Sequence, residues 1–153
     1  MPSDRARLYH EVMIGYVRNG VAPHYLDIGR SLAWKPDRAR DVLHEVVSMG
    51  LPTWLHPGTD LIASFAPFSN LPTLYRIVVN GQPHGYAQCG LEALAVSWLF
   101  PGAAVRVVSL CPHCGDEVSI RMRDGELLEL APTATVAHIN IPVAKWRGQY
   151  PMA

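Results

Sequence analysis

Neither sign of charge is in excess in this sequence, which contains thirteen Lys plus Arg and thirteen Asp plus Glu. A neutral chain has no overall field that attracts nucleic acid or an anionic membrane surface. Long apolar runs are also missing, since no segment approaches the roughly 20 apolar residues of a membrane span. The first twenty residues lack the continuous apolar core of a secretory signal. We therefore expect a cytoplasmic protein whose partner is neither nucleic acid nor a membrane.

Cysteine is scarce too, and its count of three is odd. In a reducing compartment, such cysteines are expected to be free thiols or metal ligands rather than a disulfide framework. The chain of 153 residues is 49% hydrophobic and 17% charged, which excludes a disordered protein and is enough to bury a core. The length predicts one ordinary domain, or one domain with a small helical attachment.

The first seventy residues are predicted to form three helices followed by a short β-wing. Apolar residues at helical spacing, Ser and Pro at helix starts and Gly at helix ends place the helices over residues 3–19, 24–34 and 35–50. In residues 51–70, a turn at His56-Pro57-Gly58 separates two short apolar runs, as in a hairpin. Residues 1–70 therefore predict a winged-helix-like region.

A winged helix suggests DNA binding, but the charges of the third helix argue against it. Its surface would carry both signs rather than a basic stripe. The charged and titratable residues concerned are Asp37, Arg38, Arg40, Asp41, His44 and Glu45. We favour a helical scaffold that packs on the rest of the chain.

Residues 71–153 predict an α+β core, with a mixed β-sheet and one prominent helix. The step Asn80-Gly81 lies between two extended segments and is a strong hairpin signal. The helix is expected from Gly90 to Phe100, where Pro101 and Gly102 end it. The further predicted strands are "AAVRVVSL", "DEVSIRM", "LLELAP" and "TVAHINIP".

Cys89 and Glu92 occupy the start of that helix. Unpaired N–H groups and the positive end of the helix dipole favour a thiolate at Cys89. The spacing of three residues places thiol and carboxyl on one helical face. A thiolate beside a proton-donating acid can cleave a metal–carbon bond, since sulfur binds the soft metal while the acid protonates the leaving carbon. The alternative is a buried cysteine with a glutamate that only complements the dipole.

Cys111 and Cys114 form a C-x-x-C turn in "SLCPHCGDEV". Such a turn lets two sulfurs face one metal, but a structural zinc site needs four ligands and the sequence has no second C-x-x-C. Cys89 is a candidate for a third sulfur, and His113 or His84 for a nitrogen ligand. The cations considered for this site are Hg(II), Zn(II) and Cu(I). A redox pair and two incidental thiols are the alternatives.

The segment "VNGQPHGYAQCGLEALAVSWLFPGAAVRVVSLC" resembles the organomercurial (alkylmercury) lyase family, and the layout is similar from residue 8 to about residue 142. The resemblance implies a winged-helix-like region on an α/β catalytic core that needs no cofactor. It places Cys89 at the mercury-binding, proton-relaying cysteine, and Glu92 at the catalytic aspartate. Cys111 stands where the family has a further, largely structural cysteine.

Two departures accompany this resemblance. The family uses a second active-site cysteine in a Cys-x-x-His-Phe-like segment near the C-terminus, and "AHINIPVAKWRGQYPMA" has none. Cys114 is additional to the family pattern, so Cys111 or Cys114 is the candidate for the second sulfur. Three hypotheses follow: an alkylmercury lyase, a non-catalytic protein that binds a soft metal through its thiolates, and a metal- or redox-sensing DNA-binding regulator.

Overall fold

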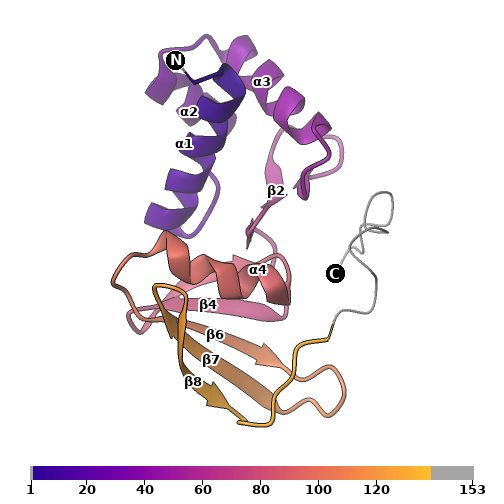
Figure 1. Cartoon of the computed structure of the whole chain (residues 1–153). Coiled ribbons are helices and arrows are strands. Elements are labelled where there is room, and N and C mark those ends of the chain that lie inside the picture. The colour runs from indigo at the N-terminus through magenta and orange to yellow at the C-terminus, as the bar shows by residue number, and fades with distance from the viewer. Residues whose placement is uncertain (1, 139–153) are drawn as a thin grey trace.

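The computed structural model describes residues 2–138, which form three helices, an eight-stranded sheet and one short helix on that sheet (Figure 1). The predicted α+β class is confirmed. The helices are α1 (Asp4–Asn19), α2 (Tyr25–Leu32), α3 (Pro36–Ser48) and α4 (Gly90–Ala95), which continues as the 3₁₀-helix η1 (Val96–Leu99). The strands are β1 (Thr53–Leu55), β2 (Ile62–Phe65), β3 (Phe68–Ser69), β4 (Tyr75–Val79), β5 (Gln82–Ala87), β6 (Val105–Leu110), β7 (Glu117–Arg123) and β8 (Glu126–Ala131). None of the helices in residues 2–138 combines the length and the apolar character that a membrane span needs.

Helix α1 begins and ends where its local sequence predicts. Ser3 caps it by accepting a hydrogen bond from the Ala6 N–H, and Gly20 ends it in the left-handed conformation at φ 74°. The apolar stripe predicted for this helix, Leu8, Val12 and Tyr16, is fully buried. Burial of this stripe supplies the packing that holds a helix of this length in place.

The sheet has the order β1-β2-β3-β5-β4-β6-β7-β8, and every pairing among the described strands is antiparallel. The expected mixed sheet is therefore corrected to an antiparallel one. The hairpin at Asn80-Gly81 forms as predicted between β4 and β5. The connection through α4 then passes over β4, so β5 and β6 run in the same direction without being neighbours. The crossover through α4 therefore does not make β5 and β6 a hydrogen-bonded parallel pair.

The predicted β-wing forms and is continuous with the rest of the sheet. The turn at His56 to Gly58 joins β1 to β2, and β3 pairs with both β2 and β5. Tyr16 of α1 stacks on Phe68 of β3 with ring centroids 4.8 Å apart. The proposed division at residue 70 stays a prediction. Of the last predicted strand, residues 135–138 are not a strand and the remainder lies outside the described residues.

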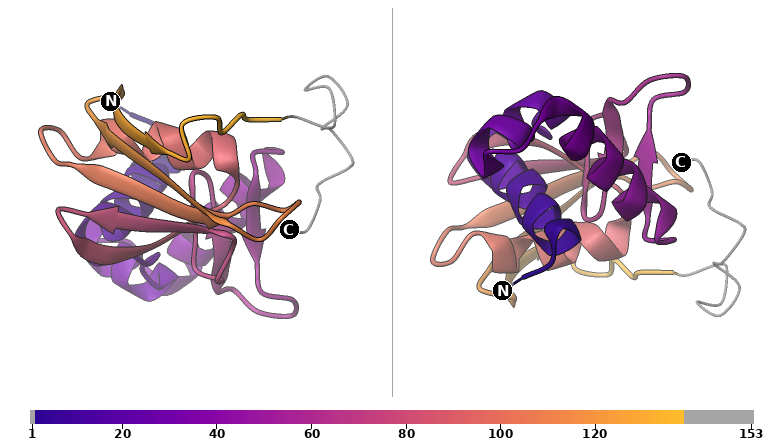
Figure 2. Two further views of the ribbon diagram at one scale, coloured as in Figure 1. Left: turned by 90° about the horizontal axis from the view of Figure 1, so that it is seen from below. Right: turned by 90° about the horizontal axis from the view of Figure 1, so that it is seen from above.

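The C-terminal end of α1 lies directly against β5, which fixes the helix on the sheet. Figure 2 shows the N-terminal helices behind the strands when seen from below and in front of them when seen from above. A Cβ on Gly85 would lie 2.7 Å from the carbonyl oxygen of Gly20, so this approach requires glycine. The His84 Nε2–H donates to the carbonyl of Tyr16 at 2.9 Å. His84, one of the predicted nitrogen ligands, is therefore engaged in holding α1 in place. In this position, one side of α1 faces α4, and residues of both helices line the pocket described below.

Candidate active site

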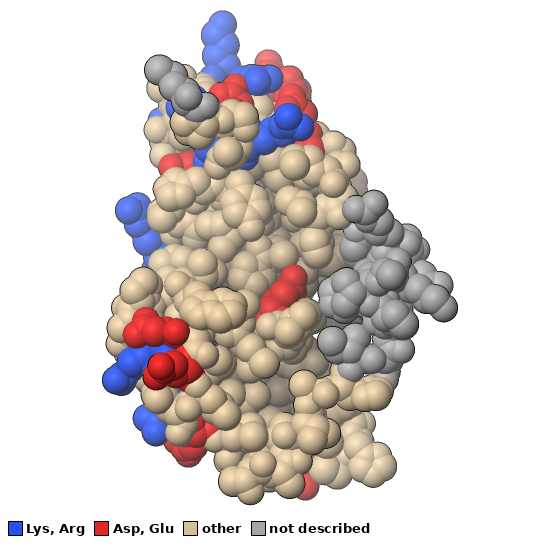
Figure 3. Space-filling view, in the orientation of Figure 1, with Lys and Arg blue, Asp and Glu red and all other residues tan. Residues whose placement is uncertain are grey.

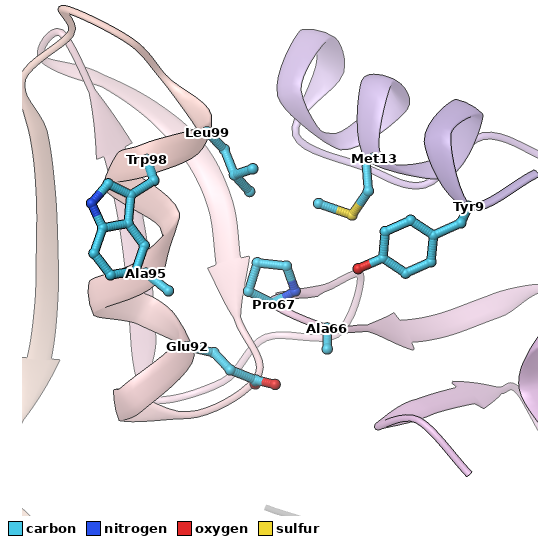
Figure 4. A pocket seen from close by; sticks show the side chains of 8 residues that line it. All are labelled: Tyr9, Met13, Ala66, Pro67, Glu92, Ala95, Trp98 and Leu99. Carbon is cyan, nitrogen blue, oxygen red and sulfur yellow. The ribbon is translucent and has the colours of Figure 1, made fainter. Parts of the chain in front are cut away.

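A pocket of about 420 Å³ lies between α1 and α4 (Figure 4). Among the described residues, its lining is apolar apart from one carboxyl, one phenol and one indole N–H. The lining residues are Tyr9, Met13, Ala66, Pro67, Glu92, Ala95, Trp98 and Leu99. Figure 4 shows Tyr9 and Met13 projecting from α1 toward the side of the pocket formed by α4 and η1. The face seen in Figure 3 carries few charged side chains at its middle, whereas charges gather toward its ends. The pocket therefore suits an apolar group.

Gln88 anchors the segment that leads from β5 to this pocket. Its backbone N–H donates to the carbonyl of Pro67 at 2.9 Å. Its side-chain amide donates to the carbonyl of Pro52 at 3.0 Å and to the Ser64 hydroxyl at 2.7 Å. Ser64 is buried, so the bond between its hydroxyl and Gln88 is partly shielded from water. The residue that follows Gln88 is held in a defined position.

That residue is Cys89, and it lies at the N-terminal end of α4 as predicted. Its backbone is extended, with φ −147° and ψ 172°, and its carbonyl accepts the first helical hydrogen bond from the Ala93 N–H at 2.9 Å. Gly90 begins the helix against the ring of Tyr75, where a Cβ would lie 3.2 Å from a ring carbon. The absence of a side chain at Gly90 lets the helix start close to β4. Cys89 itself is half-buried.

The pKa of the Cys89 thiol lies above its ordinary value, which corrects the predicted shift toward thiolate. Burial is the largest cause, and the negative charge of Glu92 adds to it. The backbone N–H groups of Glu92 and Leu91 lower the pKa, as the helix N-terminus predicts, but they do not outweigh burial. The resting site therefore favours the protonated thiol.

Glu92 is the titratable group at the centre of the site. Burial raises the pKa of its carboxyl above the usual range, and hydrogen bonding to Cys89 only partly offsets this. Its Oε2 atom is buried and has no hydrogen-bond partner among the described residues. Figure 4 shows the carboxyl reaching from α4 toward the pocket, while Cys89 is not one of the lining residues. A carboxyl whose pKa is raised by burial, and which has a buried oxygen without a partner among the described residues, is suited to hold a proton.

Glu92→Gln is expected to lower the pKa of Cys89, because the substitution removes the negative charge that raises it. The measurement is the pH dependence of iodoacetamide alkylation, followed on the Cys89 peptide by mass spectrometry. The midpoint should move to lower pH than in the wild type. Exposed Glu126, on β8, supplies the matched control Glu126→Gln, which should leave the midpoint unchanged. A midpoint that stays constant or rises in Glu92→Gln contradicts the coupling of the two groups.

Tyr9 and Met13 belong to the pocket but were not recognised as site residues from the sequence. They are four residues apart, so they share a helical face beside the buried stripe of α1. Burial raises the pKa of the Tyr9 hydroxyl, and the charge of Glu92 raises it further. Their helical spacing on α1 was the sequence signal that could have identified them as a second apolar face. Only the fold shows that this face is turned toward α4.

Cys111 and Cys114 lie in the connection between β6 and β7, apart from the pocket lining. Strand register places Ala87, Tyr75 and Ser109 in one row, because Tyr75 pairs with Ala87 and the next residue pairs with Val108. Cys89 and Cys111 each come two residues after this row, at the same end of β5 and β6. Because β4 lies between them, β5 and β6 are two strand spacings apart, which is about 10 Å.

The structure thus brings together two pairs, Cys89 with Glu92 and Cys111 with Cys114. Within residues 2–138, no group of three or more His, Cys, Asp or Glu side chains is placed to hold a metal ion. His113, the other predicted nitrogen ligand, is exposed. The metal-binding role of the three cysteines stays a prediction.

The charges of α3 pair with one another and with α1. Arg38 contacts Asp4 at 2.8 Å and Glu45 at 3.7 Å, and Arg40 contacts Asp37 at 3.4 Å. These arginines are compensated within the protein, which is consistent with the mixed face predicted for this helix.

The alkylmercury lyase (MerB) family model matches residues 68–150, or 83 of 153 residues, a range that contains Cys89, Glu92, Cys111 and Cys114. The structure is also similar to the crystal structure of the mercury-bound form of MerB2, with a TM-score of 0.69 and 18% sequence identity. That match covers 87% of this chain and 62% of the other, so the chain spans less than two thirds of that protein's length. A comparison with curated proteins found no match. At this identity, the structural likeness shows the shared fold.

Proposed function

This chain belongs to the alkylmercury lyase family, and we propose that it cleaves the carbon–mercury bond of an organomercurial, with Cys89 holding the mercury and Glu92 supplying the proton. The observation that carries the proposal is the Glu92 carboxyl at an apolar pocket. Its pKa is raised, and its Oε2 atom has no hydrogen-bond partner within residues 2–138. Its neighbour Cys89 provides a sulfur in the same helical turn. The range of the family match includes both residues.

The first step is exchange of thiols on mercury. The Cys89 sulfur binds the mercury of an organomercury thiolate, and the Cys89 proton leaves with the displaced thiol. The raised pKa of Cys89 does not prevent this exchange, because mercury replaces the proton on sulfur. The organic group R then remains bonded to the mercury on Cys89.

Protonolysis follows from Glu92. The carboxylic acid gives its proton to the carbon bound to mercury, and the electron pair of the carbon–mercury bond becomes the new carbon–hydrogen bond. The hydrocarbon leaves, Glu92 is left as a carboxylate, and Hg(II) remains on the sulfur of Cys89. A small thiol then supplies a second thiolate to mercury, and its proton returns to Glu92. A second small thiol displaces the Cys89 sulfur and gives its proton to that sulfur, so mercury leaves bound to two small thiolates. Mercury enters and leaves as substrate and product, so the reaction needs no resident cofactor.

The apolar lining indicates how the organic group is held. Met13 and Leu99 present aliphatic side chains, and Trp98 presents an indole that is 65% exposed. An aromatic or alkyl group packed here would shield the acid from water and place its carbon near Glu92. Among residues 2–138, no Lys or Arg lines the pocket, so that part of the chain offers no cation to an organic group carrying a carboxylate.

The proposal is tested by incubating the full chain with phenylmercury and an excess of a small monothiol, then quantifying benzene. We expect benzene in amounts that exceed the protein concentration, because the small thiol regenerates Cys89 and Glu92. A reaction without protein measures the background. Mercury that remains bound at a fixed stoichiometry with no benzene above background would reject cleavage and favour a non-catalytic mercury-binding protein.

A further inference from the structure

We propose that Cys111 and Cys114 form a second, independent site, a two-sulfur chelate for a soft d¹⁰ cation that accepts two thiolates, represented by Hg(II) and Cu(I). The two residues occupy the connection between β6 and β7 and are separated by Pro112 and His113. Cys111 is half-buried and Cys114 is exposed, so a cation can approach from solvent. Neither residue lines the pocket beside Glu92.

The backbone holds the two thiols in a closed turn. The Gly115 N–H donates to the carbonyl of Cys111 at 2.9 Å, and the Cys111 N–H donates to the carbonyl of Asp116 at 2.8 Å. Gly115 has φ 78°, a conformation in which glycine lets the chain fold back. The geometry of the turn is therefore set by the protein before any cation binds.

Within this turn the sulfurs are already directed toward one another and toward acceptors. The Cys114 thiol contacts Asp116 Oδ2 at 3.3 Å, within reach for a hydrogen bond. The Cys111 sulfur interacts with the Cys114 thiol and with the backbone N–H groups of His113 and Cys114. The N–H groups of His113 and Cys114 can continue to donate to the Cys111 sulfur after a metal has replaced its proton.

The number of available ligands decides which cation fits. No third His, Cys, Asp or Glu completes a metal-binding group among residues 2–138, and residues 139–153 contain none of these residue types. Zinc requires four ligands in a structural site, whereas Hg(II) and Cu(I) are satisfied by two thiolates. On binding, the two sulfur–metal bonds replace two S–H bonds, and both protons pass to the solvent.

The test uses Cys89→Ser as the parent protein, because Cys111 and Cys114 are then its remaining cysteines. The parent is loaded with Hg(II), challenged with excess monothiol and measured by native mass spectrometry. We expect one equivalent to be retained. Adding either Cys111→Ser or Cys114→Ser should abolish retention and lower the competition midpoint by about 10²–10⁴-fold, since a lone thiol loses the chelate's effective concentration. Circular dichroism confirms that each variant is folded.

The outcomes also distinguish the cations. Cu(I) should be retained in the same way as Hg(II), and Zn(II) should be lost to a weak chelator. Loss of Hg(II) from the parent, or equal retention by either double variant, overturns the chelate. Retention of Zn(II) by the parent overturns the two-coordinate assignment. None of these results depends on whether the protein cleaves a carbon–mercury bond.

Discussion

Glu92→Gln is expected to lower the rate of benzene release from phenylmercury by about 10²–10⁴-fold, the contribution usual for a positioned general acid. Glutamine keeps nearly the same shape and still fills the end of the pocket, but it cannot give a proton to carbon. Binding of phenylmercury should persist, because the Cys89 sulfur is unchanged. The measurement is benzene release together with protein-bound mercury, each as a function of time.

Two further variants sharpen this result. Glu92→Asp keeps a carboxyl but is one methylene shorter, and aspartate is the residue that the family resemblance places at this position. It should retain more activity than Glu92→Gln. Glu126→Gln removes an exposed carboxyl on β8 and should act like the wild type. Wild-type rates in Glu92→Gln would show that the proton comes from elsewhere.

Cys89→Ser is expected to reduce benzene release to the rate measured without protein. A serine hydroxyl is a hard ligand that does not hold mercury, so the organic group is no longer brought beside Glu92. Protein-bound phenylmercury should fall by one equivalent relative to the wild type in the same experiment.

A position two residues further along the chain provides the control for Cys89. Leu91 is 56% exposed in the same helical turn, so Leu91→Ser changes the start of α4 without removing the thiol. This variant should keep both mercury binding and benzene release. If Cys89→Ser still releases benzene at the wild-type rate, Cys89 is not the residue that holds the substrate.

Local signals were sufficient to predict the position of Cys89. The Asn80-Gly81 turn and the helix terminator after Phe100 bracket β5 and α4, and both features act over a few residues. The buried stripe of α1 was predictable for the same reason, since it depends on helical spacing alone. The helix expected to reach Phe100 is α-helical only to Ala95 and then tightens into a 3₁₀ turn.

Features that depend on packing between distant segments were not predictable. The sheet is antiparallel because the crossover through α4 passes over β4, and no local pattern records which strand lies between two others. The pKa of Cys89 is raised because burial outweighs the N–H groups of the helix start, and burial depends on the whole fold. Tyr9 reaches the pocket of Glu92 because α1 is fixed against β5.

Single-turnover benzene release at matched mercury occupancy tests most directly whether Glu92 protonates carbon held through Cys89. Wild type and Glu92→Gln are each loaded with one equivalent of phenylmercury, and the occupancy of Cys89 is verified by mass spectrometry before the time course begins. We expect about one benzene per wild-type protein and release slower by about 10²–10⁴-fold from Glu92→Gln. Equal release from both proteins, or none from a fully loaded wild type, would contradict this expectation.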